Sequence, residues 1–295
     1  MYTHRDGIWV SAEREKQTVK ELTEHILSCG YSVATQVEDG FMFPFPYEFA
    51  KGNTKLVCRV VDNVEYADIT VTDNHSTIPI DGKVHSLLPE FWAQWRFIPK
   101  YIDRPATYVY NCFMARERPD RDRMFNKLKK QKILDKGLVS YIAQGYNKVN
   151  KHGTLEQCII DSKISIVLET YTSDNNIVFS EKIFRALQLP RPWLLYCSPH
   201  SIELLKTHGF DVLEDYVDIA YDKIDIHWNR LDAILNQMET FINRQYTRRD
   251  YERFEQAATH NQQLLIQFAR DWHIKLECVK LDIKHPEIDW GEDAD

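Results

Sequence analysis

Residues 164–197 have the sequence ISIVLETYTSDNNIVFSEKIFRALQLPRPWLLYC, which contains the clearest β/α pattern of the chain. It begins with the apolar run Ile164–Glu169 and ends with a second apolar run, Trp193–Cys197, and each run predicts a buried strand. Ser180 is a good N-cap for a helix between them, which we expect to extend to Leu189. The order of strand, helix and strand predicts one β/α unit of a parallel sheet.

The same alternation continues on both sides of this segment. The expected elements are a strand over Thr107–Phe113, a helix over Asp120–Lys132, a strand over Leu138–Ala143, a short helix over Leu155–Ser162 and a helix over Ser201–His208 that stops at Gly209. This alternation predicts a mostly parallel sheet covered by helices on both faces. From about residue 225 the pattern is helical, with long helices expected near 225–245 and 249–274.

The N-terminal part of the chain contains the opening unit of a second α/β lobe. The expected elements are a strand at Ile8–Val10, a helix from Ser11 to Gly30, and strands at Tyr31–Val37, Leu56–Val61 and Ala67–Thr72. The prolines of the aromatic segment Phe41–Phe49 argue against a central strand there. We therefore expect an α/β protein with two Rossmann-like lobes, residues 1–105 and 106–225, followed by a long helical extension and an acidic tail over 226–295.

The composition is that of an ordinary folded protein. Of the 295 residues, 43% are hydrophobic and 27% are charged, which excludes a disordered chain. No run approaches the roughly 18 apolar residues that a membrane span needs, and Met1–Asp6 lacks the apolar core of a signal peptide. The six cysteines are far apart and form no CxxC pair, so we expect buried thiols and a cytoplasmic protein, in a cell or in an infected host cell.

A first group of candidate binding residues lies where the strand over Thr107–Phe113 is expected to lead into a helix. Arg116, Arg118 and Arg123 are candidates for a pyrophosphate clamp, because helix N-termini favour anions and arginine contacts phosphate through two nitrogens. The alternative is a solvated basic helix start that pairs with its own aspartates. The sequence Asp120-Arg-Asp122 also has the DxD pattern of manganese sites, but its arginine neighbours favour local ion pairs.

A second group lies at the next β/α junction of the same predicted sheet. Ser180 is a candidate N-cap, and Glu181 in the first turn complements the helix dipole. Lys182 and Arg185 follow within the same helix start. Such a group can hold ribose hydroxyls through its carboxylate and phosphates through its cations, whereas the alternative is simple helix capping.

Taken together, these segments resemble the C-terminal lobe of fucosyltransferase-like and exostosin-like glycosyltransferases, and still more a group of phage and metagenomic proteins of that type. The resemblance covers about residues 106–225. It rests on Tyr110–Phe113, Arg118-Pro119 with Arg123, Ile133–Ser140, Ser162–Thr170, Phe179–Leu187, Pro190–Leu194, Gly209–Asp211, Val217-Asp218 and Tyr221-Asp222. The ordered series carries the resemblance, because no single piece of it is specific.

The resemblance implies a two-Rossmann (GT-B) architecture in which the C-terminal lobe binds a nucleotide-sugar and the N-terminal lobe binds the acceptor. It also implies that Arg118 and Arg123, together with Lys182, face the donor phosphates, and that Glu181 faces the ribose or the sugar. The chain departs from its relatives at Asp120 and Asp122, where they often carry basic residues or histidine. This arginine cluster is therefore less positive than theirs.

Glycosyl transfer from such a donor requires stabilisation of the leaving diphosphate, which arginine, lysine and helix dipoles supply without a metal or other cofactor. An inverting enzyme also requires a general base near the acceptor hydroxyl. Asp73 and His75, after the strand over Ala67–Thr72, are the first candidates, and Glu38-Asp39 are the second. A retaining enzyme needs no such base.

The leading functional hypothesis is transfer of a sugar from a nucleotide-sugar to a hydroxyl acceptor. The phage-type relatives point to a 5-hydroxymethylated pyrimidine in DNA, which requires the basic stretches 116–132 and 244–253 on the cleft side, while the net charge of −7 counts against DNA binding. One alternative is a glycan or small-molecule acceptor. Another is a binding protein that has kept the fold and lost catalysis. The sequence does not predict the oligomeric state.

Overall fold

In the computed structural model, the described residues are 23–24, 26–28, 30, 32–37, 45–51, 54–59, 69–72, 75–76, 83–86, 105–149, 152–170, 172 and 176–281. The predicted strand at Ile8–Val10, the start of the first helix and the acidic tail lie outside this set. Residues 23–24 and 26–28 are helical, and the N–H of Gly30 donates to the carbonyl of Leu27 at 2.9 Å with a φ of 87°. The predicted helix end at Gly30 is confirmed.

The C-terminal region contains the mostly parallel sheet that the sequence predicts. Its five strands have the order β12-β10-β7-β8-β9. They are β7 (Tyr108–Met114), β8 (Gly137–Tyr141), β9 (Tyr146–Asn147), β10 (Ser162–Leu168) and β12 (Trp193–Tyr196). Neighbouring strands are parallel except for β9, which pairs antiparallel with β8 at the edge of the sheet.

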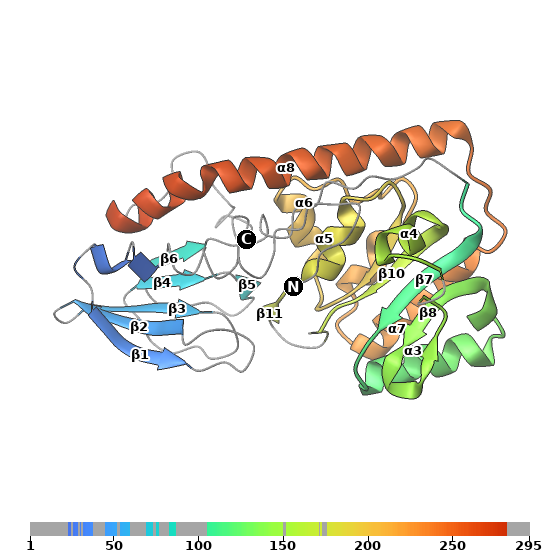
Figure 1. The fold of residues 1–295 in the computed structure, drawn as a ribbon, viewed down its shortest axis with the longest axis horizontal. Coiled ribbons are helices and arrows are strands. Elements are labelled where there is room, and N and C mark those ends of the chain that lie inside the picture. Colours follow the sequence, from blue (N-terminus) through green and yellow to red (C-terminus); the bar gives the residue numbers. More distant parts are fainter. Residues whose placement is uncertain are drawn as a thin grey trace.

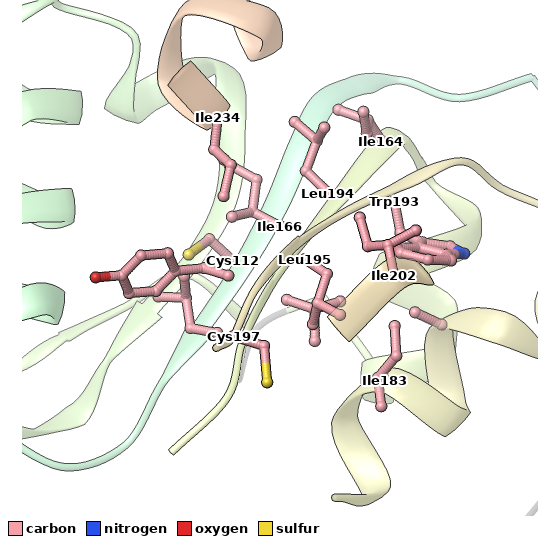
Figure 2. Packing of buried hydrophobic residues seen from close by; sticks show 14 of the residues in the cluster. Cys112, Ile164, Ile166, Ile183, Trp193, Leu194, Leu195, Cys197, Ile202 and Ile234 are labelled. Atoms are coloured by element: carbon pink, nitrogen blue, oxygen red, sulfur yellow. The ribbon is translucent and has the colours of Figure 1, made fainter. Parts of the chain in front are cut away.

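Helices cover both faces of this sheet, as the alternation predicts. They are α3 (Pro119–Lys130), α4 (Leu155–Ile160), α5 (Glu181–Leu187), α6 (Ser201–Thr207), α7 (His227–Thr240) and α8 (Arg248–Leu281). Figure 2 shows Ile166 of β10 beside Ile234 of α7 on one side of the strands, and Ile183 of α5 and Ile202 of α6 on the other side. The apolar core therefore lies on both sides of β10 and β12.

The predicted strand over Leu138–Ala143 is too long at its end. β8 stops at Tyr141, and a 3-10 turn (Ile142–Gln144) follows, closed by Gly145 at a φ of 66°. Ile142 extends the apolar pattern in the sequence, but its side chain is 60% exposed. Hydrophobicity therefore indicated a strand where the chain turns into the hairpin between β8 and β9.

The N-terminal region contains a second sheet of mixed direction, in the order β1-β2-β3-β4-β6. Its strands are β1 (Ser32–Val37), β2 (Phe45–Lys51), β3 (Thr54–Arg59), β4 (Ile69–Thr72) and β6 (Lys83–Ser86). The pairs β1–β2 and β2–β3 are antiparallel, whereas β3–β4 and β4–β6 are parallel. The two antiparallel pairs depart from the parallel pairing of a Rossmann sheet.

The prediction against a central strand in the aromatic segment is wrong. β2 lies between β1 and β3 and includes Pro46. Pro46 stands opposite Gln36, next to a register shift between Thr35 and Gln36. An irregular ladder tolerates a residue without an N–H, so the proline does not exclude an interior strand here.

A short strand pair joins the two regions. β5 (His75–Ser76) pairs antiparallel with β11 (Asn176–Ile177), and Figure 1 shows the pair between the two sheets. α8 packs on α5 and runs lengthwise from the C-terminal sheet toward the N-terminal one (Figure 1). The segment that precedes α5 is thus attached to the N-terminal region through β5.

Two further findings concern the cysteines and the helices of the described part of the chain. Cys112, Cys158 and Cys197 are buried free thiols, and burial raises the pKa of each to about 12. No helix in the described ranges is both long and apolar enough to cross a bilayer.

Candidate functional site

The strand order places a topological switch point between β7 and β10. From β7 the chain continues to β8 on one side, and from β10 it continues to β12 on the other side. In open α/β sheets, ligands bind outside the carboxyl ends of the strands at such a point. Arg116 and Arg118 follow the carboxyl end of β7, and the loop after β10 leads to Ser180 and Lys182. The two groups predicted from the sequence therefore belong to neighbouring strands at one edge of the sheet.

Glu169 is the residue that organises the β10 side of this edge. It directly follows β10, and only 1% of the residue is exposed. Its carboxylate accepts hydrogen bonds from the backbone N–H of Ser180 at 3.1 Å, from the Ser180 hydroxyl at 2.6 Å and from Lys182 Nζ at 3.2 Å. Ser180 Oγ in turn accepts from the backbone N–H of Lys182, so the predicted N-cap is confirmed.

The network leaves Lys182 fixed but accessible. Its ammonium group donates to Glu169 and, at 3.0 Å, to Ser180 Oγ, while 28% of its side chain is exposed. An ammonium group has three donors, so among the described contacts one donor remains for a ligand. Glu181, the first residue of α5, is half-buried.

The β7 side has the same arrangement of a buried carboxylate and a half-exposed cation. Asp120 lies in the first turn of α3, and its buried Oδ1 accepts from Arg118 Nε at 3.3 Å. The Arg118 side chain is 31% exposed. Because this contact uses Nε, the terminal nitrogens of the guanidinium group can still donate to a phosphate. Arg116 is exposed, and its carbonyl accepts from Arg121 Nη1 at 3.1 Å.

The aspartates of the DxD pattern serve separate contacts. Asp120 pairs with Arg118, as the ion-pair interpretation predicts, whereas Asp122 Oδ1 accepts from the Tyr141 hydroxyl at 2.8 Å and from Gln144 Nε2 at 3.4 Å. Within the described residues, no group of three or more histidine, cysteine or acidic side chains could hold a metal ion.

Two arginines of the predicted donor set have structural partners instead. Arg123 Nη2 contacts Asp232 at 3.0 Å, and its guanidinium group lies 5.0 Å from the centre of the Trp228 ring, so it attaches α3 to α7. Arg185 Nε contacts Glu156 at 2.9 Å and attaches α5 to α4, and burial lowers its pKa. Arg123 and Arg185 therefore carry no part of the argument for a donor site, and their role in donor binding stays a prediction.

Of the candidate general bases, one lies in a described strand. His75 is in β5, in register with Ile177, three positions before Ser180. Asp73 and Asp39, like Glu38, lie outside the described residues. The register of β5 therefore places His75 near the segment that leads into α5.

The start of α6, which follows β12, also lies at this edge and is bound by Asp222. Asp222 is buried, and its Oδ2 accepts from the backbone N–H groups of Ile202 at 2.9 Å and Glu203 at 3.1 Å. Burial raises the pKa of Asp222 to about 6, although these hydrogen bonds oppose the shift. Nearby, the fully buried Arg230 of α7 donates to four backbone carbonyls, one of them at Cys197, just past β12.

No role is predicted from the sequence for Glu169, Asp222 or Arg230. A local signal existed for two of them. Glu169 is an acidic residue directly after a buried apolar strand, and Arg230 is a cation on the apolar stripe of a helix. For Asp222 no comparable signal exists, because its partners are backbone groups of α6, about twenty residues away.

The basic stretch 116–132 begins at this edge with Arg116 and Arg118 but then runs away from it along α3. The exposed cations Lys129, Lys130 and Lys132 lie at the C-terminal end of α3, about 18 Å along the helix from Arg118. In the other stretch three of the four arginines have partners: Arg244 donates to the Tyr216 carbonyl, Arg248 contacts Glu252, and Arg253 contacts Asp211 and Asp215, whereas Arg249 is exposed. Lys129, Lys130 and Lys132 are therefore not part of the candidate site.

Comparison with known proteins adds no assignment: no family model, no curated protein and no solved structure matches the chain. The resemblance to glycosyltransferases therefore rests on the sequence alone. The structure itself establishes a mixed α/β fold whose mostly parallel, five-stranded sheet carries buried carboxylates and half-exposed cations at one edge.

Proposed function

We propose that this chain is a glycosyltransferase that binds a nucleotide-sugar at the carboxyl edge of β7 and β10 and transfers the sugar to a hydroxyl group. One observation carries the proposal. On each side of the switch point a buried carboxylate holds a half-exposed cation, Asp120 with Arg118 and Glu169 with Lys182. Two such cations are suited to the two phosphates of a nucleoside diphosphate.

The arrangement also suits the chemistry of the leaving group. In glycosyl transfer the acceptor oxygen forms a bond to the anomeric carbon, the bond from that carbon to the phosphate oxygen breaks, and negative charge accumulates on the diphosphate. Cations that are already fixed before the reaction stabilise this charge without reorganisation. Glu169 holds the ammonium group of Lys182 in place, because its carboxylate binds both Lys182 and the N-cap Ser180.

Within this proposal the chain has two lobes of the GT-B type, with the acceptor bound from the N-terminal side. The β5–β11 pair supports it, since it joins the N-terminal region to the segment before Ser180. If the reaction is inverting, the acceptor proton needs a base, and His75 is the candidate that the register of β5 favours.

For the acceptor, we favour a glycan or small-molecule hydroxyl over DNA. The exposed lysines of α3 lie away from the carboxyl edge, and three of the four arginines in residues 244–253 have partners in the described structure. A hydroxymethylated pyrimidine in DNA stays in the test as the competing acceptor, and a binding protein without turnover is the competing function.

A panel of nucleotide-sugars, each with and without hydroxymethylcytosine DNA, tests the proposal. We expect a donor to be hydrolysed slowly without an acceptor, and its nucleoside diphosphate to raise the melting temperature. Lys182→Met should abolish this stabilisation. The matched control is Lys206→Met, because Lys206 also pairs with a glutamate, Glu214 at 2.5 Å, but lies in an exposed position of α6.

The outcomes separate the hypotheses. Binding without turnover of any donor would favour the binding-protein alternative. Transfer only in the presence of the modified DNA would establish the DNA acceptor. Neither hydrolysis of a donor nor stabilisation by a nucleotide would overturn the glycosyltransferase proposal.

A further inference from the structure

Arg230 is a fully buried cation whose hydrogen bonds all go to backbone carbonyls. It lies on α7 and is 0% exposed. Its Nε donates to the Cys197 carbonyl at 3.0 Å, its Nη1 donates to the carbonyls of Ile224 and Asp225, and its Nη2 donates to that of Thr172. No described acidic side chain forms an ion pair with it.

At this position an apolar residue would cost less desolvation free energy than an arginine. Arg230 lies on the same stripe of α7 as the buried residues Leu231, Ile234 and Leu235. Burial disfavours the charged form and lowers the pKa of Arg230. The carbonyls compensate the charge because each presents a partial negative charge, and the planar fork reaches several of them at once. The role of this buried cation is therefore to hold together the three segments whose carbonyls it contacts.

These three segments all belong to the carboxyl edge of the sheet. Cys197 directly follows β12, residues 224–225 lead into α7, and Thr172 lies in the connection between β10 and β11. Thr172 comes three residues after Glu169. The same connection is closed at its far end, where Ser180 donates to Glu169. Arg230 therefore holds the chain three residues after Glu169, and Ser180 returns to contact the same glutamate.

We propose that Arg230 is a positioning residue of the nucleotide site: through the Thr172 carbonyl it holds the chain that leaves Glu169, so that Glu169 keeps its contacts with Ser180 and orients Lys182. The proposal rests on the proposed function for its ligand, a nucleoside diphosphate. Its structural part, the ordering of the connection, stands independently of any ligand. Lysine is a poor replacement, because a single ammonium group has three donors at one point and no planar fork.

The test compares Arg230→Met and Arg230→Lys with Arg253→Met in the full chain. Arg253 is a suitable control because it contacts Asp211 and Asp215 from α8 and has no contact with the carboxyl edge among the described residues. Urea denaturation first measures how much each variant is destabilised. Amide hydrogen exchange, followed by mass spectrometry, then measures the opening of the connection under conditions of equal global stability.

We expect exchange at the Ser180 amide to become about tenfold faster in Arg230→Met, while exchange in β7 and β8 matches that of the control. The dissociation constant of a nucleoside diphosphate should rise about tenfold in the same variant and less in Arg230→Lys, since the site loses preorganisation. Arg253→Met should leave both quantities unchanged.

The two proposals fail in different ways. If the wild-type chain binds no nucleoside diphosphate, the proposed function is wrong, and hydrogen exchange alone decides the role of Arg230. If the wild type binds the nucleotide and Arg230→Met changes neither the Ser180 exchange rate nor the dissociation constant relative to Arg253→Met, the positioning role is overturned.

Discussion

The Glu169 carboxylate binds both the backbone N–H and the hydroxyl of Ser180, at 3.1 and 2.6 Å. This contact joins the end of β10 to the start of α5 across eleven positions. Because Glu169 also contacts Lys182 and is almost fully buried, the carboxylate is at once a helix anchor and the support of a candidate phosphate ligand. Substitution of Glu169 should therefore affect both the stability of the fold and the binding of a nucleotide.

Glu169→Gln should weaken both folding and nucleotide binding. The amide keeps the size of the side chain, but its NH₂ group replaces an acceptor and the charge is lost, so Lys182 loses its buried partner. We expect a loss of about 2 kcal/mol in the free energy of unfolding, measured in urea, because Ser180 and Lys182 lose a charged acceptor of their hydrogen bonds. Titration with a nucleoside diphosphate should show weaker binding.

A matched control for this substitution is Glu214→Gln. Glu214 also pairs with a lysine, Lys206, but both side chains are exposed. Surface pairs of this kind contribute about 0.5 kcal/mol or less, and binding should not change. Equal effects of the two substitutions would show that Glu169 has no special role.

Arg118 and Arg123 should behave differently although they lie on the same helix start. Arg118 is half-exposed at the carboxyl edge, so Arg118→Met should reduce nucleoside diphosphate binding about tenfold or more at low salt. Arg123 contacts Asp232 and the Trp228 ring, so Arg123→Met should lower stability and leave nucleotide binding unchanged. Isothermal titration and urea denaturation of both variants check this, and reduced binding by Arg123→Met would instead support the role in donor binding that the sequence predicts.

Asp222 predicts a specific pH dependence of stability. Burial raises its pKa from 3.8 to about 6, so the folded state binds more protons than the unfolded state between these values. The contribution of Asp222 to stability therefore falls as the pH rises from about 4 to about 6. The free energy of unfolding of the wild type, relative to Asp222→Asn, should increase by about 2 kcal/mol when the pH is lowered from 7 to about 4.5.

The comparison with the variant is necessary because other carboxylates act in the opposite direction. Hydrogen bonds and nearby cations lower the pKa values of Asp211, Asp232 and Asp250, against the effect of burial, so their contributions are lost as the pH falls. Their effect is common to both proteins and cancels in the difference. A difference that is flat between pH 4.5 and 7 would contradict the raised pKa of Asp222.

Local chemistry made part of this structure predictable. Ser180 caps α5 and Gly209 has a φ of 87° after α6, and both were expected from residue type alone. The apolar runs of β10 and β12 were equally clear, because strands buried on both faces are continuously hydrophobic.

What the sequence did not reveal depends on residues that meet only after folding. The role of Glu169 requires Ser180 to return to the end of β10, and the role of Arg230 requires carbonyls from three separate segments. Pro46 lies in an interior strand because of a register shift opposite it, and such irregularities have no sequence signature. The sequence pattern therefore indicates the edge of the sheet but not the contacts that organise it.

The close approach of Gly137 to Tyr110 offers a test of the packing that supports this edge. A Cβ atom at Gly137 would lie 2.5 Å from Cζ of the Tyr110 ring, inside the contact distance of any two carbon atoms. Gly137→Ala should therefore cost about 2 kcal/mol in urea denaturation, as overpacking of a core does. The double variant Gly137→Ala with Tyr110→Leu should be less destabilised than the sum of the single changes, because leucine leaves the space that the ring occupied.

The control is Gly145→Ala, where nothing lies within 4 Å but φ is +66°: its cost is backbone strain, and Tyr110→Leu should not relieve it. Strict additivity in the first pair would contradict the close packing of β7 against β8 at Tyr110 and Gly137.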